Sequence, residues 1–242
     1  MVIKNPYFGR MLILDEVVQM TERDEFFYHE MLVHPAFICQ PNLKNILIIG
    51  GGDGGALRET LRYPVKKTVL VEIDKEVIKV AKEYFPWLVS ALSDDRAELI
   101  LADGIEYLKE KKRKYNIIIV DSSEPVGPSA VLYQEEFYRL LKANLSDQGI
   151  VTMQMGSPFF HLDMITKQAK LLRRVFKIVK FYMGPVPTYP GGSWCYVFLS
   201  DRVTPSSAFK NQVPALKYFH EDIYRSAFNL PVYLEKAVSE KG

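Results

Sequence analysis

Apolar runs alternate with helical patterns along the chain from residue 45 onward. Seven runs rich in β-branched or other apolar residues predict strands: residues 46–49, Thr68–Glu72, Ala97–Leu101, Asn116–Val120, Gly149–Gln154, Lys177–Tyr182 and Trp194–Leu199. Helical composition or amphipathic spacing predicts the helices between them: Ala56–Leu61, Lys75–Tyr84, Ile105–Lys111, Tyr133–Ala143 and His161–Phe176. Repeated strand–helix–strand units require right-handed crossovers and a mainly parallel sheet. No helix separates the last two strands, so we expect them to pair antiparallel at one edge.

The first 40 residues do not follow this alternation. Two short β-type runs, Gly9–Leu14 and Val17–Met20, are split by an acidic pair, and this pattern predicts a hairpin. We expect the apolar face of the hairpin to find little cover inside its own chain. A helix is expected from Glu22 to Phe37, with Thr21 as its N-cap. The predicted organisation is α/β: a small N-terminal β-hairpin domain at 1–20, and a Rossmann-like domain at 21–242 with the seven-stranded sheet of S-adenosylmethionine-type methyltransferases.

A glycine-rich loop follows the first strand of the larger domain. Gly50, Gly52 and Gly55 fit the pattern G-x-G-x-x-G, and Glu72 ends the next strand about 20 residues later. This pattern is typical of a nucleotide-binding turn at the carboxyl end of a strand. Asp53 stands where a dinucleotide would place its pyrophosphate, and a carboxylate there would repel an anion and hold a cation. The loop therefore predicts an adenosine-like ligand that carries positive charge; a generic turn in which Asp53 caps the helix is the alternative.

Acidic residues follow four of the predicted parallel strands. They are Asp53, Glu72, Asp74, Asp103, Asp121 and Glu124. Because the carboxyl ends of parallel strands meet at one edge of the sheet, we expect these side chains to lie near a common ligand. Glu72 is suited to accept hydrogen bonds from two ribose hydroxyls, and Asp103 to accept one from an adenine amino group. A helix N-cap is the alternative for Asp103.

The turn from Asp121 to Pro128 carries two carboxylates, two prolines and a glycine. Asp121 and Glu124 lie three residues apart in a segment that the prolines stiffen. Such a turn can hold an ammonium group through charge-assisted hydrogen bonds. It can also take a proton from that ammonium if one carboxylate is close and desolvated. Solvated turn acids are the alternative interpretation.

Composition and charge exclude several classes of protein. The 242 residues carry a net charge of +2, so no surface for nucleic acid or membrane is implied. Cys39 and Cys195 lie in apolar surroundings and predict buried thiols of a reducing compartment. Signal-peptide features are not found, and no apolar run approaches ~18 residues, so a cytoplasmic protein is expected. The histidines show no metal-ligand spacing, and no metal is expected.

Seven segments, in this order, carry a resemblance to a known family: Thr21–Phe26 with Tyr28–Met31, Ile48–Gly55, Val71–Asp74, Asp103–Gly104, Asp121–Pro128, Pro187–Pro190 and Ala227–Pro231. Together they resemble the spermidine synthase family of polyamine aminopropyltransferases. The resemblance runs from Phe8 to Leu234. It implies transfer of the aminopropyl group of decarboxylated S-adenosylmethionine to a diamine, usually putrescine, with methylthioadenosine as the other product. It implies no cofactor, because the donor is a co-substrate.

The resemblance also implies roles for individual residues. Asp121 would be the base, and Asp53 would hold the amine of the aminopropyl group. The implied donor-binding residues are Gly50, Gly52, Asp53, Glu72, Asp103, Gly104 and Pro128, with Glu72 on the ribose and the last three around the adenine. The implied polyamine-binding residues are Tyr28, His29, Asp53, Asp121, Ser122, Ser123, Glu124 and Tyr189. Family members are also expected to form homodimers or homotetramers through the small domain.

Two departures from the family pattern are expected to matter. The family usually has a further N-terminal segment, so this chain is expected to start inside the small domain and to lack a glutamine that members place against the donor. Glu124 stands where the family often has Asp, which moves the charge by about one bond length. An S-adenosylmethionine methyltransferase and a non-catalytic polyamine- or nucleoside-binding protein are the alternatives. The acceptor stays open among putrescine, cadaverine, agmatine and longer polyamines.

Overall fold

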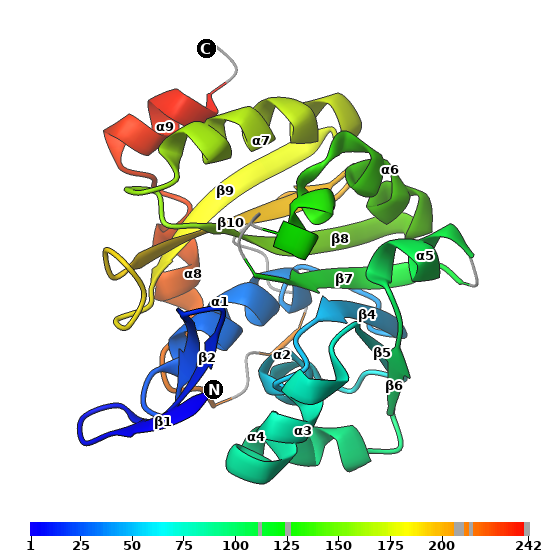
Figure 1. The fold of residues 1–242 in the computed structure, drawn as a ribbon. Helices are drawn as coiled ribbons and strands as arrows, with labels where there is room; N and C mark the ends of the chain where they lie inside the picture. Colours follow the sequence, from blue (N-terminus) through cyan, green and yellow to red (C-terminus); the bar gives the residue numbers. More distant parts are fainter. Residues whose placement is uncertain (111–112, 124–126, 206–210, 213–214, 240–242) are drawn as a thin grey trace.

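The strands predicted from residue 45 onward form one seven-stranded sheet (Figure 1). The structure is a computed structural model and describes residues 1–110, 113–123, 127–205, 211–212 and 215–239. The strand order is β6-β5-β4-β7-β8-β10-β9. The bounds are β4 (Asn45–Gly50), β5 (Lys67–Glu72), β6 (Ala97–Leu101), β7 (Tyr115–Asp121), β8 (Leu145–Gly156), β9 (Ile178–Pro185) and β10 (Ser193–Ser200). The first five strands in this order run parallel, whereas β10 lies antiparallel between β8 and the edge strand β9, which confirms the predicted antiparallel pair.

Helices cover both faces of this sheet, because alternate residues of each strand point to opposite faces. In β4, Ile46 and Ile48 pack on one side, and Leu47 and Ile49 on the other. The first side is covered by α1 (Glu25–Phe37), α2 (Gly55–Thr60) and α8 (Glu221–Ala227). The second is covered by α5 (Gly104–Lys109), α6 (Glu135–Asn144), α7 (Leu162–Val175) and α9 (Val232–Val238). Within the described ranges, no helix is both long enough and apolar enough to cross a membrane.

The remaining elements differ from the sequence prediction mainly at their ends. Helix α3 (Lys75–Tyr84) has the predicted bounds, whereas the predicted helix 105–111 ends at Lys109, and residue 111 lies outside the described residues. Helix α1 starts after Asp24 rather than after Thr21, because Thr21 is still the last residue of β3. The Thr21 hydroxyl instead donates a hydrogen bond to Asp24 Oδ1 across 2.5 Å. The sequence analysis did not predict α8, α9 or three short helical segments: α4 (Pro86–Val89), η1 (Ser90–Ser93) and η2 (Gly127–Tyr133), the last of which contains Pro128.

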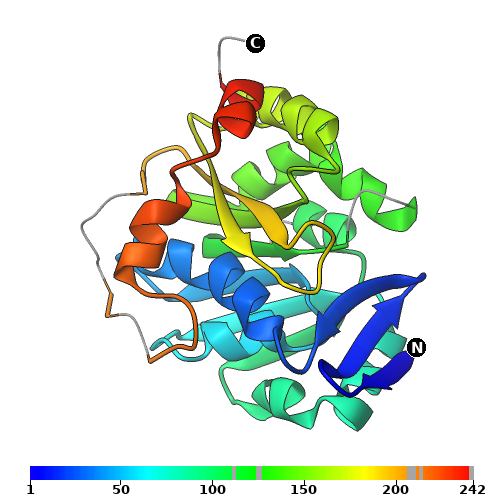
Figure 2. The same cartoon turned by 90° about the vertical axis from the view of Figure 1, so that its left-hand side faces the viewer.

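The N-terminal segment forms a three-stranded antiparallel sheet rather than a bare hairpin (Figure 2). Its strands are β1 (Val2–Asn5), β2 (Gly9–Leu14) and β3 (Val17–Thr21). Leu12 pairs with Met20, and both side chains are buried against Phe85 and Leu88 at α4. The expectation that this apolar face finds little cover in its own chain is therefore wrong for Leu12 and Met20, which α4 covers, whereas Val17 stays 48% exposed. The division of the chain at residue 20 stays a prediction.

The two cysteines are buried, as the sequence predicts. Cys39 and Cys195 are both buried and form no disulfide with each other. Burial raises the pKa of the Cys195 thiol far above its usual value. This side chain therefore behaves as a small apolar residue of the core.

Candidate active site

Three polar side chains converge at the carboxyl edge of the sheet. One nitrogen or oxygen atom from each of His29, Asp53 and Asp121 lies within 4.8 Å of the others. They come from α1, from the loop after β4 and from the end of β7. Strands β4 and β7 are parallel neighbours with Gly50 opposite Asp121, so the loop and the strand end are side by side. The strand order therefore places Asp53 and Asp121 together, as the acids of neighbouring strand ends.

Bare backbone in the glycine loop allows two carboxylates to approach it closely. Gly51 has a φ of +70°, and a Cβ atom there would lie 2.8 Å from Oδ2 of Asp121. A Cβ atom at Gly52 would lie 2.8 Å from Oε2 of Glu72, which instead accepts a hydrogen bond from the Gly52 N–H across 2.9 Å. A side chain at either glycine would displace a carboxylate of the site.

Backbone donors fix Glu72 at the end of β5. Its Oε2 accepts from the Gly52 N–H, and its Oε1 accepts from the Asp74 N–H across 2.8 Å. Burial raises the pKa of this carboxyl, and the backbone hydrogen bonds oppose that shift. A carboxylate offers about four lone-pair positions. Glu72 can therefore keep both backbone bonds and still accept from two ligand hydroxyls.

Asp103 caps a helix beside two exposed apolar side chains. Its Oδ1 accepts a hydrogen bond across 2.7 Å from the Ile105 N–H, in the first turn of α5. These are the contacts of a helix N-cap, which was the alternative interpretation of Asp103. Ile73 is 67% exposed and Leu101 is 57% exposed. Ile73 directly follows β5 and Leu101 ends β6, the strand paired with it, so both lie at this edge. The sequence analysis did not single out this apolar pair, which is suited to contact a flat aromatic ring.

The carboxylate of Asp121 has one bonded and one unbonded oxygen. The Tyr28 hydroxyl donates a hydrogen bond to Oδ1 across 2.8 Å. Oδ2 is buried and has no hydrogen-bond partner in the described part of the chain. Burial and the neighbouring Asp53 raise the pKa of Asp121 to about 7. A carboxylate with that pKa exchanges a proton near neutrality, which suits a general base.

Both ring nitrogens of His29 face carboxylates. Nδ1 lies 2.7 Å from Oε2 of Glu25, and Nε2 lies 3.5 Å from Oδ2 of Asp53. Arg58 donates two hydrogen bonds to the Glu25 carboxylate, across 2.8 and 2.9 Å. Burial alone would lower the pKa of His29, but Asp53 and Glu25 outweigh it and raise that pKa well above its usual value. The two carboxylates that face the ring therefore favour the charged form of His29.

Asp53 has two roles in this geometry. Its Oδ1 accepts a hydrogen bond from the Gly55 N–H across 2.7 Å, at the start of α2, as a capping residue would. Its Oδ2 faces the His29 ring. His29 holds the pKa of Asp53 below its usual value against the opposing effect of burial. The Asp53 carboxylate therefore caps the start of α2 and also pairs with the buried ring of His29.

The sequence analysis missed the partners of His29. Glu25 precedes His29 by four residues, a spacing that places two side chains of a helix together, so this signal was available. Arg58 comes from α2 and has no local signal, because its contact with Glu25 depends on how α1 and α2 pack.

Aromatic side chains from three segments form a wall beside the Asp121 carboxylate. The Tyr28 ring lies 5.8 Å from that of Tyr189 and 5.9 Å from that of Tyr196. Trp194 packs edge-on against Tyr189 with 4.6 Å between the ring centroids. The Tyr189 hydroxyl donates to the carbonyl of Gln19 in β3. The N-terminal sheet therefore supports this wall.

The turn after β7 is anchored from β8 and η2. The Gln154 amide donates to the Ser122 carbonyl across 3.0 Å, and the Tyr133 hydroxyl donates to the Ser123 carbonyl across 3.2 Å. The Ser122 hydroxyl is buried and without a hydrogen-bond partner among the residues that the structure describes. Glu124, the second predicted acid of this turn, lies outside the described residues. Gln154 was not predicted, although a polar residue inside an apolar strand is a signal for such an anchor.

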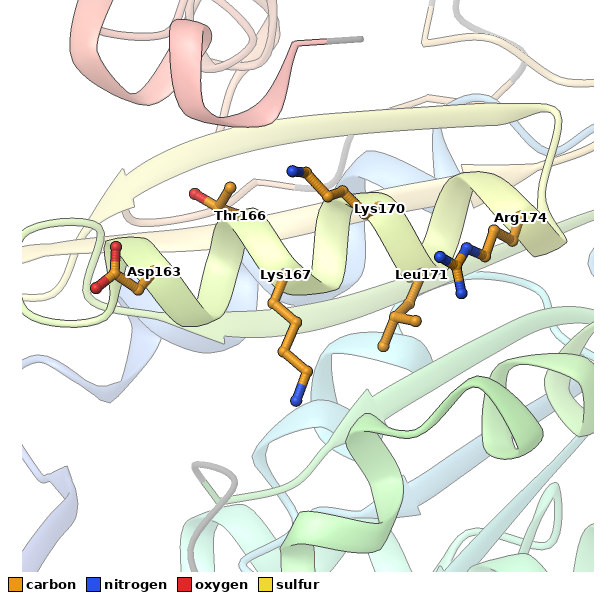
Figure 3. Close-up of a pocket in the computed structure, with 6 residues that line it drawn as sticks. All are labelled: Asp163, Thr166, Lys167, Lys170, Leu171 and Arg174. Carbon is orange, nitrogen blue, oxygen red and sulfur yellow. The ribbon is translucent and has the colours of Figure 1, made fainter. Parts of the chain in front are cut away.

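A depression on α7 is separate from this cluster. It has a volume of about 440 Å³ and is lined by Asp163, Thr166, Lys167, Lys170, Leu171 and Arg174 (Figure 3). All six residues belong to α7, on the face of the sheet opposite to α1. It is the basic outer surface of an amphipathic helix, and it shares no residue with the cluster at the sheet edge. We therefore take the cluster as the candidate active site.

A family model and curated relatives place this chain among proteins of one family. The family model described as the spermine/spermidine synthase domain matches residues 25–211. Polyamine aminopropyltransferases of Thermoanaerobacter sp. (strain X514) and Hydrogenobaculum sp. (strain Y04AAS1) are 40% and 41% identical to this chain over 236 and 239 residues. These alignments cover 96% and 98% of this chain and 85% of each relative.

Two solved structures resemble this one closely. A spermidine synthase in complex with the transition-state analogue AdoDATO gives a TM-score of 0.94 at 36% identity and covers 98% of this chain and 83% of that one. The spermidine synthase from Thermotoga maritima gives a TM-score of 0.91 at 35% identity and covers 98% of this chain and 82% of that one. The similarity therefore extends over nearly the whole of this chain, the N-terminal sheet included.

Proposed function

The chain belongs to the spermine/spermidine synthase family and is an aminopropyltransferase, and we propose that it uses decarboxylated S-adenosylmethionine as donor and putrescine as acceptor. The products would be spermidine and methylthioadenosine. One observation carries the proposal: Asp121 has a buried, unbonded Oδ2 beside a second carboxylate, Asp53. This pair suits a site that binds an ammonium group and removes its proton.

The nucleoside of the donor lies along the strand ends in this proposal. Glu72 accepts from the two ribose hydroxyls, next to the bare backbone of Gly50 and Gly52. Asp103 and Gly104 meet the edge of the adenine, and Ile73, Leu101 and Pro128 line its faces. A related spermidine synthase binds the transition-state analogue AdoDATO, which supports a site for a donor of this type. The donor is a co-substrate, so the reaction needs no cofactor.

Asp53 gives the site its preference for a decarboxylated donor. Its carboxylate would attract the amine of the aminopropyl group and the positive charge on sulfur. The α-carboxylate of S-adenosylmethionine would stand beside the same side chain and repel it. In a desolvated site, placing this second negative charge beside Asp53 without a cation to pair with it would weaken binding by several kcal/mol. The expected discrimination between the two donors is correspondingly large.

The acceptor amine reacts beside Asp121. The ammonium gives one proton to Oδ2, and the lone pair that this leaves on nitrogen attacks the carbon bonded to sulfur. The carbon–sulfur bond breaks, and its electron pair stays on sulfur, which leaves as the neutral thioether of methylthioadenosine. The protein does no covalent chemistry, so its contribution is positioning, worth about 7–11 kcal/mol at best, together with removal of the proton.

The polyamine-binding residues would be those that surround this point. Tyr28 orients Asp121 and, with Tyr189, forms the aromatic wall for the methylenes of the diamine. His29 lies beside Asp53. The turn Ser122–Glu124 would meet the distal end of the acceptor, and the length of Glu124 would affect which acceptor fits.

The experiment that tests this proposal is an acceptor panel. The protein is incubated with decarboxylated S-adenosylmethionine and putrescine, cadaverine, agmatine or spermidine, and methylthioadenosine is quantified. We expect the highest kcat/KM with putrescine. A longer acceptor that is used at least tenfold better would overturn the choice of putrescine and leave aminopropyl transfer intact.

A further inference from the structure

The ion pair between His29 and Asp53 occupies the place that the proposed function gives to the amine of the donor. Nε2 of His29 lies 3.5 Å from Oδ2 of Asp53. The other carboxylate oxygen, Oδ1, is bonded to the Gly55 N–H. A ligand ammonium that binds Asp53 through Oδ2, the oxygen without a backbone bond, would meet the same atom that faces the imidazolium. Two cations at that distance repel strongly where water does not screen them.

The other side of the His29 ring is held firmly. Nδ1 lies 2.7 Å from Oε2 of Glu25, and the two side chains are 1% and 3% exposed. Ionised carboxylates only accept hydrogen bonds, so each ring nitrogen must carry a hydrogen to bond its partner. Arg58 binds both oxygens of Glu25, which fixes the carboxylate in front of Nδ1. The Nδ1–H is therefore locked, and the Nε2–H is the one that points toward the ligand site.

We propose that Glu25 is a positioning residue that keeps Nδ1 of His29 protonated, so that the Nε2 proton is exchanged for the ammonium of an aminopropyl ligand that binds Asp53. The proton leaves to solvent, and the Nε2 lone pair then accepts an N–H from the ammonium. The cluster keeps the same charge, because one cation replaces another. The inference rests on the proposed function, since it takes the donor amine to bind at Asp53.

The groups around His29 decide at which pH this exchange can be seen. Charged or titratable groups face His29 from each packed element: Glu25 and Tyr28 from α1, Asp53 from the glycine loop, Arg58 from α2 through Glu25, and Asp121 from β7. Burial alone would raise the pKa of Glu25, but His29 and Arg58 hold it at about 2, so Glu25 stays ionised. Asp121 has a pKa of about 7 and is mostly ionised at pH 8. Protons released at pH 8 therefore come mainly from His29.

Calorimetry of the intact protein at pH 8 tests the exchange. Binding heats in phosphate and in Tris, which differ in ionisation enthalpy, give the number of protons released per ligand bound. We expect about one proton for decarboxylated S-adenosylmethionine and about none for methylthioadenosine, since only the first carries an amine to replace the proton. Both ligands share the same nucleoside, so contacts of the ribose and adenine cancel in the comparison.

Two variants and a control assign the proton. His29→Gln should abolish the release, and Glu25→Gln should reduce it to less than half, because His29 then loses the carboxylate that favours its charged form. Glu22→Gln is the matched control, because Glu22 pairs with Arg10 at the surface, outside the cluster. Ligand binding to this variant should release as many protons as binding to the wild type.

The result that overturns the exchange is equal proton release by the two nucleosides in the wild-type protein, a comparison that needs no variant to fold. Full release by Glu25→Gln would overturn the role of Glu25. Equal release by a protein that still transfers the aminopropyl group contradicts the exchange alone. A complete lack of binding by decarboxylated S-adenosylmethionine overturns both the exchange and the proposed function.

Discussion

The hydroxyl of Tyr28 donates a hydrogen bond to Oδ1 of Asp121 across 2.8 Å, between residues that lie 93 positions apart in the sequence. The bond holds one oxygen of the carboxylate against α1. The other oxygen, Oδ2, lies against the glycine loop, 2.8 Å from the position that a Cβ atom at Gly51 would take. The carboxylate is thus oriented by one oxygen and available through the other, which is the arrangement that a general base requires.

The first prediction concerns Asp121 itself. Asp121→Asn keeps the shape of the side chain and its contact with Tyr28 but cannot take a proton. We expect kcat to fall by about 10²–10⁴-fold, while donor binding stays measurable by calorimetry. A variant within threefold of the wild-type kcat would show that another group accepts the proton.

The second prediction separates orientation from proton transfer. Tyr28→Phe removes the hydrogen bond that favours the ionised carboxylate, so the pKa of Asp121 should rise. The acidic limb of the pH profile of kcat/KM, expected near pH 7 in the wild type, should move to higher pH, and kcat/KM at pH 7 should fall about tenfold.

Tyr189→Phe is the matched control for this experiment. The Tyr189 hydroxyl bonds the Gln19 carbonyl, and its ring lies in the same aromatic wall. The acidic limb should stay where it is in this variant. An equal shift in both variants would mean that the wall as a whole, and not the hydrogen bond to Asp121, sets the pH dependence.

The raised pKa of Asp121 also predicts a stability effect. Its folded value of about 7 lies above the ordinary 3.8, so the folded protein loses stability as pH rises from about 4 to 7 and the carboxyl ionises. Asp121→Asn removes that cost. We expect the variant to increase the free energy of unfolding by about 1–3 kcal/mol at pH 8, and by less at pH 5, in urea denaturation. A variant with the same free energy of unfolding as the wild type at both pH values would contradict the raised pKa of Asp121.

The strands and the edge that carries the site follow directly from the sequence. The run Asn116–Val120 is apolar on both faces because helices cover both sides of the sheet, and β7 has almost these bounds. Asp53 and Asp121 come together because Asp53 follows β4, Asp121 ends β7, and these two buried strands are parallel neighbours. The pattern of strands and strand-end acids is local in the sequence, so it can be read without the structure.

The partnerships within the site are not local and could not be predicted in the same way. Arg58 reaches Glu25 only because α1 packs on α2, and Tyr28 reaches Asp121 only because α1 packs on the face of the sheet against β7. The cover of the N-terminal sheet was also missed. Helix α4 is a single turn of four residues, too short to give a periodic signal, yet it buries Leu12.

A fourth prediction concerns assembly, which stays a prediction from the sequence. Ile3 and Val17 are 40% and 48% exposed on the N-terminal sheet, whose outer strands, β1 and β3, pair with no further strand among the described residues. Such edges favour pairing across a two-fold axis. We expect a homodimer or homotetramer, with residues 1–20 in the interface. Val17→Lys should shift the protein toward monomer in light scattering. Val232→Lys, at a 65% exposed position on α9, should not. A wild-type protein that is monomeric and fully active at micromolar concentration would contradict this prediction.

The most direct test of the central claim is the identity of the products. The protein is incubated with putrescine and either decarboxylated S-adenosylmethionine or S-adenosylmethionine, and the products are separated and identified by mass spectrometry. Spermidine and methylthioadenosine in equal amounts from the decarboxylated donor, with no comparable rate from S-adenosylmethionine, are the predicted result. Methyl transfer to the diamine at a similar rate would contradict aminopropyl transfer as the function of this site.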